Sequence, residues 1–198
     1  RTLFVITIAV PQFVSLLLMR NFLNDHGPLN GLLQTLHLTN GPIPFLTDPL
    51  WAKFSIIFVN MWIGIPFTML VATGIIMNLP TEQIEAAEID GASKFQIFKS
   101  ITFPQILLIM APSLIQQFIG NINNFNVIYF LTGGGPTNSE YYQAGSTDLL
   151  VTWLYKLTVS AKDYNLASVI GILIFAISAT FSLLAYTRSS SFKEGAAK

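Results

Sequence analysis

The sequence predicts an all-α membrane protein in which several spanning helices form one bundle. Only 10% of its residues are charged, against about 25% in soluble domains, and 52% are hydrophobic. The charges are also segregated, and four long segments carry none: 2–19, 54–81, 100–139 and 164–187. Because a spanning helix needs roughly 20 apolar residues, we expect spans at about 2–19, 54–78, 104–131 and 166–187. The alternative, the buried core of a large soluble bundle, would leave an unusually long uncharged surface.

The absence of certain residue types from the sequence argues against several classes of function. The net charge is zero, which argues against nucleic acid as a partner, and without cysteine no Cys-ligated metal or thiol nucleophile is possible. The predicted spans contain no ionisable Asp, Glu, Lys, Arg or His, which disfavours ion-coupled transport and intramembrane hydrolysis. The glycine-rich segment 132–136 lacks the lysine of a nucleotide-binding loop. Uphill transport would therefore need energy from a separate subunit.

The second predicted span contains a helix-breaking pair. Gly64 and Pro66 lie two residues apart, shortly after Asn60. Broken helices near the middle of the membrane are typical of transport sites, so we expect a break here, with a packing kink as the alternative. The span follows a polar connector, 20–50, whose middle at 29–38 is long enough for one short helix.

The third span is rich in amides in its second half. Amides in hydrocarbon cost free energy unless they are hydrogen-bonded, so we expect these side chains to face a cavity or another helix. They offer donors and acceptors without charge, as a neutral polyhydroxylated ligand requires. Hydrogen bonding between helices is the alternative. The amides are Gln116, Gln117, Asn121, Asn123, Asn124 and Asn126.

The segment 81–100, which we call the hinge, is the most charged part of the chain. Acidic residues lie in its first half and basic residues in its second half, which suits a helix dipole. Thr81 can cap the first helix, and Asp90-Gly91 interrupts the apolar spacing. We therefore expect two short helices on the membrane surface, with a turn at Gly91. An interfacial helix without a partner is the alternative.

The spacing of Glu85-Ala86-Ala87, Gly91, Ile101 and Pro104 resembles the EAA signature of ABC-importer permeases, with Phe103 where leucine is usual. The resemblance implies a single transmembrane domain over 1–198 of the MetI-like type, in a multi-pass cell-membrane protein, with a parent chain that begins upstream of Arg1. It implies a non-catalytic subunit whose hinge docks on cytoplasmic ATPase subunits, which carry the ATP and magnesium. A second permease and an extracytoplasmic sugar-binding protein are the other implied partners. The implied coupling residues are Glu85, Ala86, Ala87, Asp90, Gly91, Ala92, Ile101 and Pro104.

Further motifs look like those of the large membrane subunits of maltose/maltodextrin transporters. They include Asn60-x-Trp62-x-Gly64-x-Pro66 and Asn123-Asn124-Phe125. The resemblance implies translocation of a neutral oligosaccharide by alternating access; the alternatives are another neutral solute or a membrane scaffold without transport. Phe67, Gln117 and Gly120 depart from the residues usual in that subunit. The implied sugar contacts are Asn60, Ile63, Gly64, Phe67, Gln117, Gly120, Asn121 and Asn124.

Overall fold

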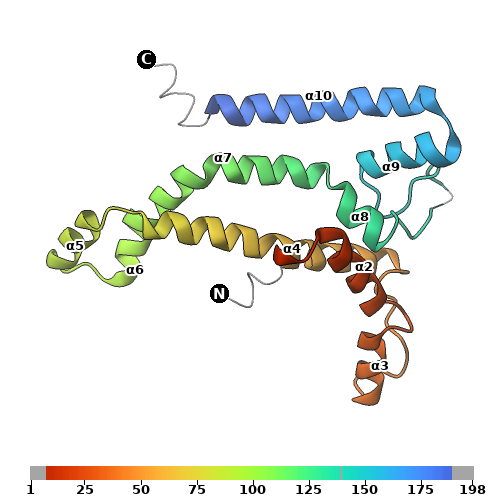
Figure 1. Ribbon diagram of the computed structural model, residues 1–198, viewed down its shortest axis with the longest axis horizontal. Coiled ribbons are helices and arrows are strands. Elements are labelled where there is room, and N and C mark those ends of the chain that lie inside the picture. The colour runs from red at the N-terminus through yellow and green to blue at the C-terminus, as the bar shows by residue number, and fades with distance from the viewer. Residues whose placement is uncertain (1–7, 139, 189–198) are drawn as a thin grey trace.

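The structure is a computed structural model, which describes residues 8–138 and 140–188. Three long α-helices dominate it: α4 (Pro49–Met77), α7 (Phe103–Ile122) and α10 (Tyr164–Arg188). They run along the longest axis of the molecule, with the hinge helices at one end and several short helices at the other (Figure 1). The short helices are α2 (Gln12–Phe22), α3 (Pro28–Thr35), α5 (Glu82–Ile89), α6 (Lys94–Ile97), α8 (Phe125–Leu131) and α9 (Leu150–Lys156), and π-helical turns follow α6 (Phe98–Thr102) and α9 (Leu157–Ala161).

Within the described residues, three helices are long and apolar enough to cross a membrane: Pro49–Met77, Lys94–Ile122 and Tyr164–Thr187. At most 17% of the most apolar window of each helix is buried inside the molecule, so most of each helix faces outward, as a lipid-facing helix does. These helices fit the multi-pass membrane protein that the composition predicts. The first residues of the predicted span at 2–19 lie outside the described residues, and its described part ends in α2.

Three small apolar clusters hold the helices together. Leu16 of α2, Val59 of α4 and Leu131 of α8 are fully buried against one another. A second cluster joins the last turns of α4 to α7, and a third joins α9 and its π-helical turn to α10. The first cluster is important for the candidate site, because it places α8 beside α4.

The predicted break at Gly64 and Pro66 is wrong, because α4 is one continuous helix through both residues. Pro66 removes a single backbone donor and is buried. A full break in hydrocarbon would leave several backbone groups without partners, so the continuous helix costs less. The Thr68 hydroxyl also donates to the carbonyl oxygen of Gly64, at 3.2 Å, within this turn.

The helix break lies instead in the third predicted span, between α7 and α8. Asn124 is the N-cap of α8, and its side-chain oxygen accepts from the backbone N–H of Val127 at 3.3 Å. Asparagine competes well with the helical backbone in this way. The amide-rich sequence therefore ends one helix and begins the next.

The hinge contains the two short helices that the sequence predicts, α5 and α6, with Gly91 between them at a φ of +82°. The side-chain cap expected from Thr81 is wrong, because Thr81 is already helical and its side chain makes no cap bond. The cap that forms is on α6, where Ser93 and Gln96 make a capping box. The chain then passes from α6 through its π-helical turn into α7 without a break.

The connector at 20–50 contains the expected short helix, α3 (Pro28–Thr35), and is tied together by Asn30. This side chain is 1% exposed. Its Nδ2 donates to the carbonyl oxygens of Asn24 and Ile43, and its Oδ1 accepts from the backbone N–H of Ile43 at 2.8 Å. One asparagine thus joins two parts of the connector that are 19 residues apart, from 24 to 43.

We expect Asn30→Ala to open the connector and to lower the stability of the protein by about 2 kcal/mol, because buried backbone groups lose their partners. Asn40→Ala is the matched control, since Asn40 is exposed and makes no side-chain bond that the structure records. Thermal unfolding and limited proteolysis of residues 24–48 measure the effect. Equal protease sensitivity of the two variants would contradict this role of Asn30.

Candidate functional site

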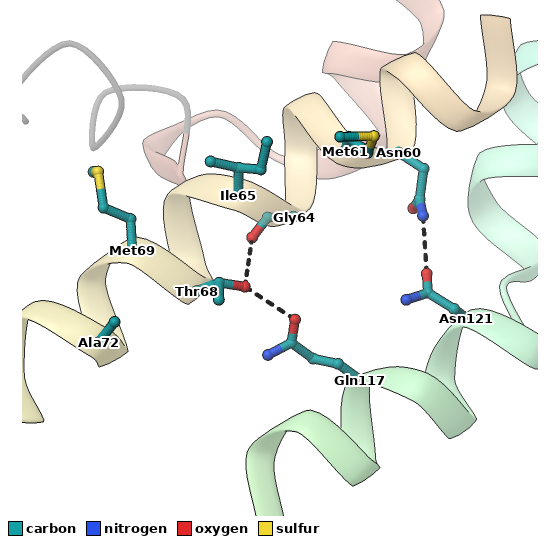
Figure 2. A pocket seen from close by; sticks show the side chains of 9 residues that line it. All are labelled: Asn60, Met61, Gly64, Ile65, Thr68, Met69, Ala72, Gln117 and Asn121. Atoms are coloured by element: carbon teal, nitrogen blue, oxygen red, sulfur yellow. Dashed lines mark hydrogen bonds between the residues drawn. The ribbon is translucent and has the colours of Figure 1, made fainter. Parts of the chain in front are cut away.

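A cleft of about 450 Å³ lies between α4 and α7, and we call it the amide cleft (Figure 2). On α4, Asn60, Gly64 and Thr68 face it because residues four apart share one side of a helix. Gln117 and Asn121 of α7 face it for the same reason. The cleft is lined by Asn60, Met61, Gly64, Ile65, Thr68, Met69, Ala72, Gln117 and Asn121.

Asn60 is the centre of the polar contacts in the cleft. Its Nδ2 donates to Asn121 Oδ1 at 2.9 Å, and its Oδ1 accepts from Asn124 Nδ2 at 2.9 Å. Asn121 belongs to α7 and Asn124 begins α8. One side chain of α4 therefore holds both sides of the break between α7 and α8.

Gln117 has hydrogen-bonding capacity that the protein does not use. Its Oε1 lies 3.0 Å from Thr68 Oγ1, and its Nε2 is buried without a partner among the described residues. Thr68 has one hydroxyl proton, and the Gly64 carbonyl competes for it. Rotating the amide by about 180° would let Nε2 donate to Thr68 and leave Oε1 free. In either orientation, one end of the amide has no hydrogen-bond partner among the described residues.

The lining of the cleft is uncharged and combines amides with apolar side chains. Amide groups both donate and accept hydrogen bonds, whereas phosphates and carboxylates are usually held by arginine or lysine. Met61, Ile65 and Met69 offer apolar surface beside the amides. In the part of the chain that the structure describes, no three His, Asp or Glu side chains are grouped closely enough to hold a metal ion. The cleft suits a neutral ligand rich in hydroxyl groups.

The structure brings together only part of the predicted sugar-contact set. Asn60, Gly64, Gln117 and Asn121 line the cleft, and Asn124 is hydrogen-bonded to it. The other predicted contacts do not line it. Ile63 and Phe67 line a smaller cavity of about 240 Å³ on the α2 side of α4, and Gly120 is exposed, with open space around its Cα.

Sequence reasoning missed Thr68 and Ala72, which also line the cleft. A signal for both was present, because they continue the four-residue spacing of Asn60 and Gly64 along α4. This spacing carries information only once α4 is known to be unbroken. The expected break at Pro66 concealed it.

Two of the remaining amides make hydrogen bonds to other helices, and Gln116 lines a separate cavity between α7 and α10. Asn123 Nδ2 donates to Ser178 of α10 at 2.9 Å, and Asn126 Nδ2 donates to Gln12 of α2 at 3.3 Å. Both interpretations of the amide-rich segment therefore apply, to different residues. Amides on the α4 side form the cleft, whereas Asn123 and Asn126 hold neighbouring helices.

The predicted coupling residues gather at the other end of the molecule. A cavity of about 410 Å³ lies at the turn between α5 and α6. Glu85 and Ala86 are exposed on α5, and Pro104 lies in the first turn of α7. Two large apolar side chains near the turn are also exposed, Ile89 at 87% and Phe95 at 71%. The cavity is lined by Ala87, Asp90, Gly91, Ala92, Gln96, Ile97, Ser100 and Ile101.

Comparison with known proteins gives one consistent result. A family model described as "Binding-protein-dependent transport system inner membrane component" matches residues 1–191. A galactooligosaccharides transport system permease protein of Bacillus subtilis is 40% identical, over 99% of this chain and 47% of that protein. A maltodextrin transport system permease protein of Streptococcus pneumoniae is 38% identical, over 96% of this chain and 45% of that protein. The chain spans about half the length of the curated relatives it matches.

The fold has a close counterpart among solved structures. A bacterial ABC transporter involved in the import of the acidic polysaccharide alginate matches with a TM-score of 0.76 and 26% sequence identity. The match covers 89% of this chain and 59% of that chain. The same kind of transporter has also been solved in complex with a periplasmic protein that holds an alginate pentasaccharide, again with a TM-score of 0.76.

Proposed function

Because this chain belongs to the family of binding-protein-dependent transport system inner membrane components, we propose that it forms part of the translocation path of an ATP-driven importer for a neutral oligosaccharide. The amide cleft is the observation that supports this most directly. It is uncharged, it lies between two spanning helices, and Gln117 keeps a hydrogen-bonding group unused there. A sugar hydroxyl can both donate to and accept from such amides.

The hinge supports the proposal of a separate energy source. The cavity between α5 and α6, with Ile89 and Phe95 exposed beside it, offers an ATPase subunit a concave surface that combines polar and apolar side chains. The hinge continues through α6 and its π-helical turn into α7, which lines the cleft. ATP binding and hydrolysis on the partner would therefore move α7 against α4 and expose the cleft to alternate sides of the membrane.

The uncharged lining narrows the class of substrate. The named relatives act on galactooligosaccharides and on maltodextrin, both neutral, whereas the solved structure concerns an acidic polysaccharide. An anionic sugar would need a basic side chain in the cleft, and none lines it. We propose a maltodextrin-like oligosaccharide as the first substrate to test, with a galactooligosaccharide or another neutral solute as the alternatives.

Uptake by the full-length protein, assembled with its ATPase, second permease and sugar-binding protein, tests the substrate class. We expect proteoliposomes to take up labelled maltotriose or galactotriose in an ATP-dependent way. An anionic alginate trisaccharide should not be taken up. Transport of the anionic sugar alone would contradict the proposal.

A second experiment separates a permease from a scaffold. Asn121→Ala combined with Asn124→Ser removes two amides, while serine keeps the oxygen that caps α8. We expect uptake to fall about tenfold or more with the complex still assembled on size-exclusion chromatography. If less complex assembles, but the complex that does assemble takes up sugar normally, the result would favour a scaffold protein.

A further inference from the structure

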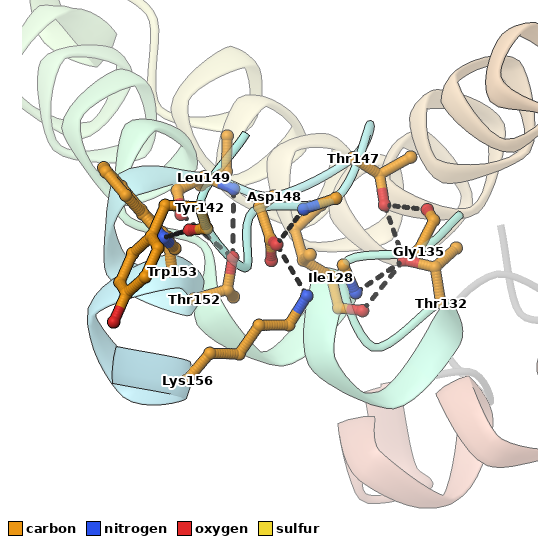
Figure 3. Close-up of polar contacts among 12 residues, drawn as sticks. Ile128, Thr132, Gly135, Tyr142, Thr147, Asp148, Leu149, Thr152, Trp153 and Lys156 are labelled. Carbon is orange, nitrogen blue, oxygen red and sulfur yellow. Dashed lines mark hydrogen bonds and ion pairs between the residues drawn. The ribbon is translucent and has the colours of Figure 1, made fainter. Parts of the chain in front are cut away.

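At the end of the molecule opposite the hinge, which we call the outer end, two segments of the connector between α8 and α9 pack together (Figure 3). The hydroxyls of Thr132 and Thr147 lie 2.9 Å apart, and the backbone N–H of Ser146 donates to the Pro136 carbonyl oxygen at 2.8 Å. The first segment directly follows α8, and the second directly precedes α9. These contacts connect the end of α8 to the start of α9.

A nearly buried ion pair links the end of this connector to α9. The side chain of Asp148 is only 3% exposed, and its Oδ2 accepts from Lys156 Nζ at 2.6 Å and from the backbone N–H of Gly145 at 2.7 Å. A Cβ at Gly134 would overlap the Asp148 carboxylate, and one at Gly145 would overlap the Gly134 carbonyl. Close packing on Asp148 thus explains Gly134, and Gly133 beside it has a φ of +62° that favours glycine. We call Gly134, Gly145, Asp148 and Lys156 the outer ion-pair cluster.

Helix α9 also contacts α8 through aromatic rings. Tyr155, the neighbour of Lys156, lies edge-on to Phe125 and to Tyr129, each with ring centroids 5.1 Å apart. Phe125 and Tyr129 stack on each other at 4.9 Å. Phe125 directly follows Asn124, which donates to Asn60 in the amide cleft. A continuous set of contacts therefore leads from the outer ion-pair cluster to the cleft.

We propose that Asp148 and Lys156 are positioning residues for the amide cleft: their ion pair holds α9 to the connector, Asp148 packs on Gly134 just after α8, and α8 in turn holds Asn124 against Asn60. Breaking the pair would loosen α8 at its outer end and leave Asn124 free to move away from α4. A buried ion pair adds little net stability over apolar residues of similar size, and its best-attested role is to specify one arrangement. The effect on transport rests on the proposed function, whereas the effect on α8 does not.

Hydrogen exchange of the full-length protein in nanodiscs tests the structural part. We expect the α8 amides, 125–131, to exchange about tenfold faster in Lys156→Met and in Asp148→Asn, because each change leaves a buried charged or polar partner unpaired. Lys156→Arg, which keeps the charge, should exchange much more slowly than Lys156→Met. Lys53→Met is the control, since Lys53 is exposed on α4 and makes no ion pair that the structure records.

Unchanged α8 exchange in Lys156→Met and Asp148→Asn would overturn the proposal. An equal effect of Lys156→Arg and Lys156→Met would also overturn it, because packing rather than charge would then be responsible. If the ion-pair variants fail to assemble, Tyr155→Leu keeps an apolar side chain and removes the ring contacts. A normal rate of hydrogen exchange in α8 of that variant would also contradict the proposal.

Uptake kinetics test the functional part. In the assembled importer, Lys156→Met should raise the KM for oligosaccharide about tenfold with a smaller change in kcat. The reason is that the change disturbs the amide cleft, where the sugar binds, whereas ATP is hydrolysed on the partner subunit. A loop with a merely structural role would lower the yield of folded complex and leave the KM unchanged. If the wild-type importer takes up no oligosaccharide, the proposed function fails, and the exchange experiment still decides the role of the ion pair.

Discussion

Gly91→Val should leave the protein folded in the membrane and separate ATP hydrolysis from uptake. Gly91 has a φ of +82°, and a Cβ there would meet no atom within 4 Å. Valine therefore fits in space, but its backbone is strained at positive φ by about 1–3 kcal/mol. The turn relaxes to another conformation and changes the angle between α5 and α6. We expect the sugar taken up per ATP hydrolysed to fall about tenfold or more.

Gly91→Asn is the matched control, because asparagine tolerates the left-handed conformation better than other side chains. Its coupling ratio should stay close to that of the wild-type protein. Both variants are compared in proteoliposomes that contain the complete importer, with uptake and phosphate release measured on the same sample. Normal coupling in Gly91→Val would show that the turn geometry does not matter for the transmission of movement.

Asn60→Leu should remove most uptake and leave the assembly intact. Leucine has a similar volume but cannot bond Asn121 or Asn124, whose amide groups then face the cleft without their α4 partner. A hydrogen bond between membrane helices contributes only about 1 kcal/mol, so the helices should stay together. A bound sugar would lose the ordered amides that recognise it, and we expect its apparent affinity to fall about tenfold to a hundredfold.

Asn78→Leu is the control on the same helix. Asn78 is the C-cap of α4, and its side chain donates to the Gly74 carbonyl, away from the cleft. The KM for uptake and the retention of the partner subunits on purification are measured for both variants. Equal KM values would place the sugar somewhere other than the amide cleft. Loss of the partner subunits from Asn60→Leu alone would mean that these amides serve assembly.

The sequence by itself determined the class of fold and the kind of site. Uncharged runs longer than a bilayer is thick require helices, because no other single segment satisfies its own backbone in lipid. The spacing of Glu85, Gly91 and Pro104 identified the hinge, and the turn at Gly91 was predicted from local chemistry alone. The amides of the third span indicated a polar, uncharged site, because amide groups need hydrogen-bond partners in hydrocarbon.

Only the tertiary structure decided which amides form the site. Asn121 lies in the cleft and Asn123 bonds Ser178, although only one residue separates them in sequence. The tertiary structure also decided the position of the helix break. Asn124 caps α8 and bonds Asn60, so the chain breaks there, whereas Pro66 costs α4 only one backbone donor and stays helical. The ion pair between Asp148 and Lys156 depends on how the connector between α8 and α9 packs on α9. Local propensities are properties of short segments, but these outcomes depend on which distant segment supplies the partner for each polar group.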